Sequence, residues 1–420
     1  MAGREELLAA VAAEQSAIEE LLIDLVQAPT LLGSERAGQE IMRGAFAELG
    51  LQPREVPLDA EALRQHPGAS PFSWDVDAKF NVVAEWGPPK SNGGRSLILN
   101  GHIDVVDPGR ADMWSSPPFV ARRDGDWLYG RGAGDMKAGL AAIVGAVRGL
   151  RRLGLEPLAP VELQSVVEEE CTGNGAYQCV LSGRPADAVI VTEPTSLTIQ
   201  TSQVGVLWFQ VVVRGRPAHA GDAPIGLNAI EASFAVIAAL RSLEVELNIN
   251  PPAPFDVYDH PINLNIGMIR GGDWPSTVAA ECVLHCRLAL FPGASVDELK
   301  ARVEAAVAAG AAAMPGGFEA RVVYDGFACE GYNLDHESPL VSTLGDASEQ
   351  AAGARPALIA STATTDARSF ALYAGTPAVC FGPHAESIHG ADERVSLPSV
   401  LQTAQTLALF IDGWCGLERG

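Results

Sequence analysis

The sequence has few basic residues and no long apolar run. Its 420 residues include 29 lysines and arginines against 52 aspartates and glutamates, which gives a formal net charge of −23. A nucleic-acid-binding protein needs a basic surface, so this composition argues against that class. No apolar stretch reaches the roughly 20 residues that span a bilayer, and the first residues lack the pattern of a signal peptide. We therefore expect no nucleic-acid or membrane partner and a cytoplasmic location.

Cysteine is also scarce and forms no recognisable pattern. The seven cysteines are an odd number and include no Cys-X-X-Cys pair. Without a secretory signal, we expect reduced thiols that lie mostly in the core. Cys282 and Cys286 come nearest to a zinc-binding pair, but they fall in a strand-like segment without a second pair, so we expect no zinc there.

The length and the order of the expected elements favour two domains. Residues 1–203 and 327–420 predict an α/β catalytic domain, in which a mixed sheet carries helices on both faces. Between them, residues 204–326 show the order β-α-β-β-α-β, which is typical of an inserted ferredoxin-like α+β domain. In the first domain we expect one helix over residues 5–26 and an irregular segment over residues 57–78.

Residues 97–106 predict a buried strand with a polar end. The unbroken apolar run before Asn100 is typical of a strand that is covered on both faces. His102 and Asp104 are two residues apart, so their side chains leave the same face of an extended segment. An Asp that accepts one ring N–H of a His orients the other nitrogen toward a metal. Taken alone, such a His is more often an ordinary polar residue.

Further acidic residues follow other expected strands. Asp135 follows residues 130–134, Gly-Arg-Gly-Ala-Gly, which lack the third glycine of a dinucleotide-binding loop. Asp135 could also be a helix N-cap. Glu169 and Glu170 end the strand over residues 161–167, and Glu193 ends the next strand, where we expect another turn and helix. Because ligands bind at the carboxyl ends of strands in open α/β sheets, we expect these side chains to converge.

His389, in the last polar loop, completes a set of five candidate ligands with His102, Asp135, Glu170 and Glu193. Imidazole and carboxylate ligands suit zinc, cobalt or manganese. Five protein ligands are too many for one open catalytic zinc, but they suit two divalent ions that share a bridging carboxylate. Glu169, beside Glu170, is then a free carboxylate that can act as general base.

Five segments together resemble the metal-site motifs of the M20 metallopeptidase family, which includes acetylornithine deacetylase, succinyl-diaminopimelate desuccinylase, aminoacylases and carboxypeptidase G-type enzymes. These segments are residues 101–104, 130–139, 169–176, 192–195 and 389–393. The resemblance extends over nearly the whole chain. It implies that His102 and Glu193 hold one ion, that Glu170 and His389 hold the other, and that Asp135 bridges them.

The same resemblance implies further roles. Glu169 would be the catalytic acid and base, and Asp104 would orient His102. The inserted domain would act as a lid and form a homodimer. His219 would then stabilise the oxyanion in the partner subunit's site.

Two arginines match positions with which the family binds a substrate carboxylate, a task that suits a guanidinium group. Arg368 is one, although it could also be a surface residue at a helix start. Arg287 is the other, although it stands farther from the following Pro-Gly than the family's arginine does. The family's Asn before this strand is absent here. His384 stands where glycine is common, and it could line the site or replace His389 as a ligand.

The sequence therefore predicts a two-metal amide hydrolase that removes the acyl group from an N-acyl amino acid or a similar small amide, as acetylornithine deacetylase does. The alternatives are another C–N hydrolase of this fold, such as a dipeptidase, a carbamoylase or an aromatic amine hydrolase. A protein that kept the fold and binds metal or ligand without catalysis is a more distant alternative.

Overall fold

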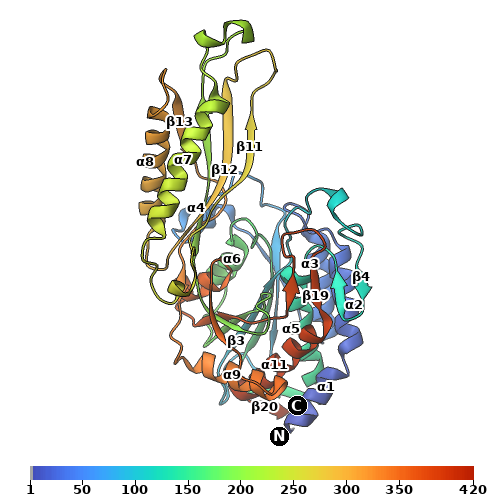
Figure 1. Cartoon of the computed structure of the whole chain (residues 1–420). Coiled ribbons are helices and arrows are strands. Elements are labelled where there is room, and N and C mark those ends of the chain that lie inside the picture. The colour runs from blue at the N-terminus through green and yellow to red at the C-terminus, as the bar shows by residue number, and fades with distance from the viewer. Residues whose placement is uncertain (1–2) are drawn as a thin grey trace.

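Two β-sheets organise the chain in this computed structural model, which describes residues 3–420 (Figure 1). We call the part around the nine-stranded sheet the large unit, and residues 205–323 the small unit. Both chain ends lie in the large unit, and the small unit extends away from it at the top of Figure 1.

The large sheet is mixed, as predicted. Its four central strands β7, β3, β8 and β17 are parallel, and antiparallel strands lie outside them. In sheet order the strands are β1 (Arg54–Pro57), β2 (Phe80–Trp86), β7 (Val161–Val166), β3 (Leu97–His102), β8 (Val189–Val191), β17 (Ala378–Cys380), β9 (Ile199–Gln203) and β15 (Tyr332–Asn333), and β16 (Leu358–Ser361) also pairs with β9.

Helices cover both faces of this sheet because alternate residues of its strands are apolar on both sides. In β3, Leu97 and Leu99 join the core under α5 and α11, whereas Ile98 joins the core on the α6 side. The helices are α1 (Arg4–Ala12), α2 (Gln15–Gln27), α3 (Arg36–Glu48), α4 (Ala60–Gln65), α5 (Ala138–Arg152), α6 (Asn174–Ser182), α9 (Pro339–Ala352), α10 (Ala367–Ser369) and α11 (Leu397–Cys415).

The small unit has the predicted order β-α-β-β-α-β. Its strands are β10 (Gly205–Arg214), β11 (Leu264–Gly271), β12 (Glu281–Leu290) and β13 (Glu319–Val323), arranged β11-β12-β10-β13, and β14 (Ala328–Cys329) pairs with the start of β10. Helices α7 (Ala229–Leu247) and α8 (Val296–Ala312) pack on one face of this sheet. Its role as a lid and dimerisation domain stays a prediction.

Two small sheets complete the large unit. One has the order β18 (Ala385–Glu386), β19 (Arg394–Ser396), β5 (Trp127–Tyr129) and β4 (Arg122–Asp124), and the other pairs β20 (Leu417–Arg419) with β6 (Leu155–Pro157). All seven cysteines are free and buried. Among the described residues, no helix is long and apolar enough to cross a membrane.

Three local predictions were wrong. The helix expected over residues 5–26 is broken at Ala13 and Glu14. Both α1 and α2 pack on α5, so their apolar residues follow one continuous helical pattern in the sequence despite the break. The segment over residues 57–78 contains α4, which Asp59 caps through the N–H groups of residues 61 and 62. No helix follows Glu193, because Ser196 and Leu197 adopt positive φ angles in a turn that leads to β9.

Candidate metal centre

His102 is the last residue of β3 and lies fully inside the large unit. Its Nε2 atom is 3.2 Å from Oδ1 of Asp135, and its Nδ1–H donates to the backbone carbonyl of Asp104 at 2.9 Å. Gly101 allows this packing, since a Cβ atom there would lie 2.9 Å from Leu140 Cδ2. The tautomer and orientation of the His102 ring are therefore set by the backbone that follows the strand.

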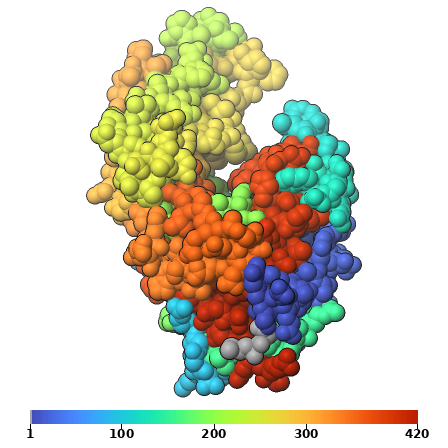
Figure 2. Space-filling view, turned by 60° about the horizontal axis from the view of Figure 1, so that its bottom comes forward, coloured from blue at the N-terminus to red at the C-terminus, as the bar shows by residue number. Residues whose placement is uncertain are grey.

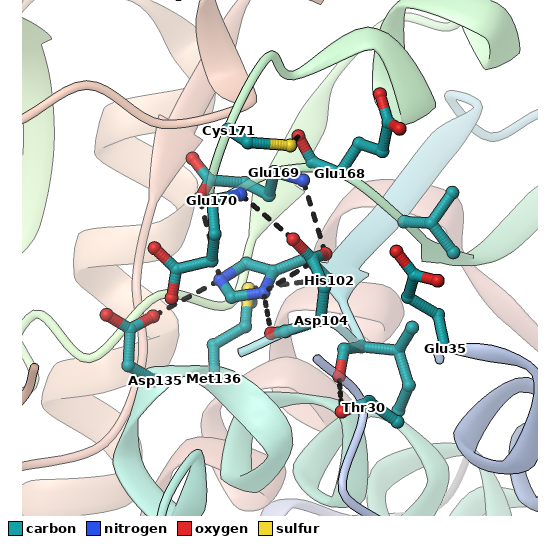
Figure 3. A network of polar contacts seen from close by, with 12 residues as sticks. Thr30, Glu35, His102, Asp104, Asp135, Met136, Glu168, Glu169, Glu170 and Cys171 are labelled. Atoms are coloured by element: carbon teal, nitrogen blue, oxygen red, sulfur yellow. Dashed lines mark hydrogen bonds and ion pairs between the residues drawn. The ribbon is translucent and has the colours of Figure 1, made fainter. Parts of the chain in front are cut away.

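Asp104 differs from its predicted contact. Its carboxylate stays 3.8 Å from Nδ1 of His102, and it instead accepts the backbone N–H groups of Glu169 at 3.2 Å and Glu170 at 3.0 Å. Figure 3 shows these bonds between Asp104 and the turn that carries the two glutamates. The residue thus orients His102 through its main chain and holds the Glu169–Glu170 turn through its side chain.

The five predicted ligands form two groups that share Asp135. One group contains His102, Asp135 and Glu193, and the other contains Asp135, Glu170 and His389, with the candidate ligand atoms of each group within 4.8 Å of one another. Oδ1 of Asp135 faces His102, whereas its Oδ2 is 3.3 Å from Nε2 of His389. Asp135 therefore does not cap α5, which begins at Ala138, and it stands between the two groups as a bridging carboxylate would.

The three consecutive acids after β7 point to different places. Glu168 has a positive φ of 64° and is held by Lys79 at 2.8 Å and by the indole N–H of Trp74 at 2.6 Å. Glu169 lies 3.8 Å from His102 Nε2 and lines the cleft, and Glu170 lies 3.1 Å from His389 Nε2.

Burial has the largest influence on the pKa values of three carboxylates around His102, those of Glu169, Glu193 and Asp104. It raises the pKa of Glu169 and of Glu193 well above the usual value, and their neighbouring carboxylates add to this rise, although His102 opposes it. Burial also raises the pKa of Asp104 to about 7, with His102 opposing. Each carboxylate is thus costly to keep charged in this pocket without a nearby cation.

The pKa values of the two imidazoles are also raised, but here the neighbouring carboxylates are the cause and burial opposes the rise. Hydrogen bonds to Asp135 and Glu170 raise the pKa of His389 to about 11, although burial opposes the rise. Burial lowers the pKa of His102, but its bond with Asp135 and the charge of Glu193 raise it well above the usual value on balance. Burial would raise the pKa of Asp135, but both imidazoles bond to it and lower its pKa. The site therefore carries a negative potential that attracts positive charge.

The donor set fits a pair of divalent cations. Two imidazoles and three carboxylates converge, and none of these carboxylates forms an ion pair with Lys or Arg among the described residues. Bound divalent ions would balance the buried charge, and imidazole with carboxylate suits first-row transition metals better than calcium.

Glu393 belongs to the family-like segment 389–393, but no role was predicted for it. It is fully buried, pairs with Arg131, and accepts the backbone N–H groups of Gly132, Gly134 and Asp135 at 2.9–3.0 Å. Arg131 also donates to the carbonyl of Gly390, next to His389. One carboxylate therefore ties the loop of Asp135 to the loop of His389. Its position four residues after His389 was the available signal.

Three of the remaining candidates lie away from both groups. His384 contacts Ser196 at 2.9 Å and Glu386 at 3.5 Å, and it belongs to neither group. Arg368 is buried, and its guanidinium donates to the carbonyls of Thr365 and Thr172, so it is not a surface residue. His219 is exposed and lies beside the β11–β12 turn through a bridge to Thr277. Figure 1 shows that turn at the end of the small unit farthest from the large sheet.

A cleft of about 410 Å³ runs between the ligand groups and the small unit. Glu169, Glu170 and His389 line one side, and Trp208 and Arg287 line the other. In Figure 2 the surface is hollowed between the yellow and yellow-green small unit and the cyan and orange-red parts of the large unit. The cleft therefore opens onto Glu169 and onto two of the candidate ligands, Glu170 and His389.

A mixed α/β fold with two groups of imidazole and carboxylate ligands that share one carboxylate is the arrangement of a two-metal hydrolase. Sequence comparison gives the family, because residues 98–413 match the peptidase family M20/M25/M40. The chain belongs to this family. The prediction of a metal-dependent hydrolase of linear amide bonds is thereby confirmed, together with the predicted family.

Individual relatives agree with this assignment. The chain is 31% identical over 375 residues to N-formyl-4-amino-5-aminomethyl-2-methylpyrimidine deformylase of Halalkalibacterium halodurans, covering 84% of this chain and 87% of that protein. It is 28% identical over 349 residues to acetylornithine deacetylase of Proteus mirabilis, covering 82% and 85%. Among solved structures, human carnosine dipeptidase 1 has a TM-score of 0.82 at 16% identity, covering 99% of both chains, which shows a shared fold.

We predict that Glu393→Ala weakens metal binding. Removing this carboxylate leaves Arg131 and three backbone N–H groups without their partner, at a cost of about 3–5 kcal/mol for a broken buried ion pair. Titration with zinc or cobalt, followed by calorimetry, should show reduced affinity and a lower unfolding temperature.

The matched control is Glu386→Ala, which removes a more exposed carboxylate from the same loop region. Equal metal affinity in wild type and Glu393→Ala would show that Glu393 does not position the ligands.

Proposed function

We propose that the protein removes a short acyl group from an N-acyl amino acid or a similar small amide, with two zinc, cobalt or manganese ions. The observation that carries this proposal is the pair of ligand groups sharing Asp135, with the carboxylate of Glu169 beside them in the same cleft. In this assignment His102 and Glu193 hold one ion, Glu170 and His389 hold the other, and Asp135 bridges. When bound, such ions activate a water molecule and polarise the amide carbonyl.

Glu169 is the proposed general base and acid. It takes one proton from the attacking water while the water oxygen bonds to the carbonyl carbon. The C–N bond then breaks, and Glu169 gives that proton to the leaving nitrogen. Asp104 supports this role, because its bond to the Glu169 N–H fixes the start of the side chain.

Arg287 is the better of the two predicted arginines for a substrate carboxylate. It lines the cleft and forms no ion pair with an acidic side chain among the described residues, with only a long bond of 3.4 Å to the Thr362 carbonyl. A half-buried guanidinium without an anion favours a ligand that supplies one. Arg368 is buried and two of its N–H groups donate to backbone carbonyls, so we propose that it supports the site without touching the substrate.

The relatives support a short acyl group. A formyl group is named in one relative and an acetyl group in the other, whereas their amines differ. We therefore propose that this protein shares with these relatives the removal of a short acyl group, whereas the amine can differ.

The test is a panel of one amino acid carrying N-formyl, N-acetyl, N-succinyl or N-carbamoyl groups, together with a dipeptide. We expect turnover of the formyl or acetyl compound when zinc, cobalt or manganese is supplied, loss with a chelator, and recovery when metal returns. Release of the free amine measures the rate, and elemental analysis should find two ions per chain. Hydrolysis of the dipeptide alone would contradict a deacylase.

Replacing Glu169 with Gln should separate catalysis from metal binding. The amide cannot accept the proton, so we expect turnover to fall by at least about 100-fold while both ions remain bound. Steady-state rates and metal content of the same sample provide the measurement. Glu85→Gln, on an exposed position of β2, is the control and should behave as wild type. Near-normal turnover of Glu169→Gln would remove Glu169 from this role.

We also propose a homodimer through the small unit. Strand β11 is an edge of its sheet, with Ile269 52% exposed, and α7 exposes Phe234 at 62%. An exposed apolar edge strand beside an exposed apolar helix face favours association, because a second copy of the chain would bury both surfaces. His219, exposed at the far end of this unit, would then act in the partner's cleft and stabilise the oxyanion.

Mixing two inactive variants tests this arrangement. We expect His219→Ala and Glu169→Gln to be dimers with low turnover on their own. A mixed dimer combines an intact Glu169 with an intact His219 from the partner, so reassembled mixtures should regain activity. Light scattering establishes the mass, and the rate of the mixture is compared with the sum of its parts. A monomeric wild type, or no gain on mixing, would contradict the proposal.

A further inference from the structure

The sheet of the small unit has two faces of different character. Leu207, Phe209 and Val211 of β10 belong to the core beneath α7 and α8. Because side chains alternate along a strand, Trp208 and Gln210 leave the opposite face. Both helices of the small unit pack on the other face, and Trp208 and Gln210 line the cleft beside the metal centre.

Register places a row of side chains across this open face. Trp208 of β10 lies opposite Arg287 of β12, and Arg287 lies opposite Asn265 of β11. Residues directly opposite each other in a sheet project to the same side, so all three face the cleft. The row is thus one wall of the cleft, across from Glu169 and His389.

An aromatic pair forms one end of this wall. The rings of Trp208 and Phe327 meet edge to face, with centroids 5.3 Å apart and planes at 80°. The backbone of Gly326 packs directly on the indole, since a Cβ atom there would lie 2.6 Å from Trp208 Cε3. On the other ring, the guanidinium carbon of Arg368 is 5.4 Å from the Phe327 centroid. Both rings are therefore fixed by their neighbours before a substrate enters.

We propose that the amide hydrolysed here carries a flat aromatic or heteroaromatic ring, which packs against Trp208 while the amide lies at Glu169. The buried ring of Phe327 holds Trp208 in place. This inference rests on the proposed function and adds the substrate class. A fixed aromatic surface loses little conformational freedom on binding, and it favours rings through offset or edge-to-face contact. With the short acyl group proposed above, the ring belongs to the amine. A ring on the acyl group would present the same flat surface, but it would contradict the short acyl group.

The experiment compares four substrates on the metal-loaded wild-type enzyme. N-acetylphenylalanine carries the ring on the amine and N-benzoylglycine carries it on the acyl group, whereas N-acetylalanine and N-acetylornithine carry no ring. We expect N-acetylphenylalanine to exceed both ring-free compounds in kcat/KM by about tenfold or more. A higher kcat/KM for N-benzoylglycine instead would contradict the short acyl group.

Two results would overturn the inference, and they are distinguishable. Ring-free substrates with equal or higher kcat/KM overturn the ring preference and leave the proposed function in place. No turnover of any N-acyl compound, in this panel or in the acyl panel, overturns both.

Variants of Trp208 then test whether this residue causes the preference for ring-bearing substrates. Trp208→Leu should lower kcat/KM for the preferred ring compound more than for N-acetylalanine, chiefly through KM, and Trp208→Phe should recover most of the preference. Metal content and unfolding temperature are measured on the same samples, and the wild-type panel decides the question if Trp208→Leu does not fold. An equal loss for both substrates would mean that Trp208 only supports the junction between the units.

Discussion

The structure depends on the concentration of acidic side chains at one end of a buried sheet. Asp135, Glu169, Glu170 and Glu193 lie together with little solvent and without a Lys or Arg partner among the described residues. Such a group is unfavourable unless positive charge compensates it. The two imidazoles meet part of this need, and the remaining negative charge is what divalent ions would balance. The uncompensated negative charge destabilises the metal-free protein. Binding of divalent ions would relieve this destabilisation, which would favour binding.

A second layer of contacts keeps these groups in place. Asp104 binds the main chain of the Glu169–Glu170 turn, and Glu393 binds the main chain around Asp135. Both carboxylates accept backbone N–H groups. They therefore fix the backbone from which a ligand side chain projects, and do not contact the ligand atoms at its tip. Ligands from loops that lie far apart in the sequence are therefore held by two buried carboxylates that need not touch metal themselves.

Much of the site was predictable because polar residues at the ends of apolar strands are rare and conspicuous. His102, Asp135, Glu170, Glu193 and His389 were all found in this way, and the structure brings them together. The parallel centre of the sheet and the β-α-β-β-α-β order of the small unit also follow from local apolar patterns. The break between α1 and α2 did not, because both helices bury their apolar residues against the same α5.

The sequence by itself determined which residues are chemically able to hold metal and which strands carry them, since strand period and residue type are local properties. Only the tertiary structure decided their partners. It gave the His102 ring a backbone carbonyl, and it assigned Asp104 to a turn 65 residues away. It also buried Arg368 against two carbonyls, recruited Glu393 and placed Trp208 on the open face of its sheet. These outcomes depend on which segments meet in space, and no spacing along the chain encodes that.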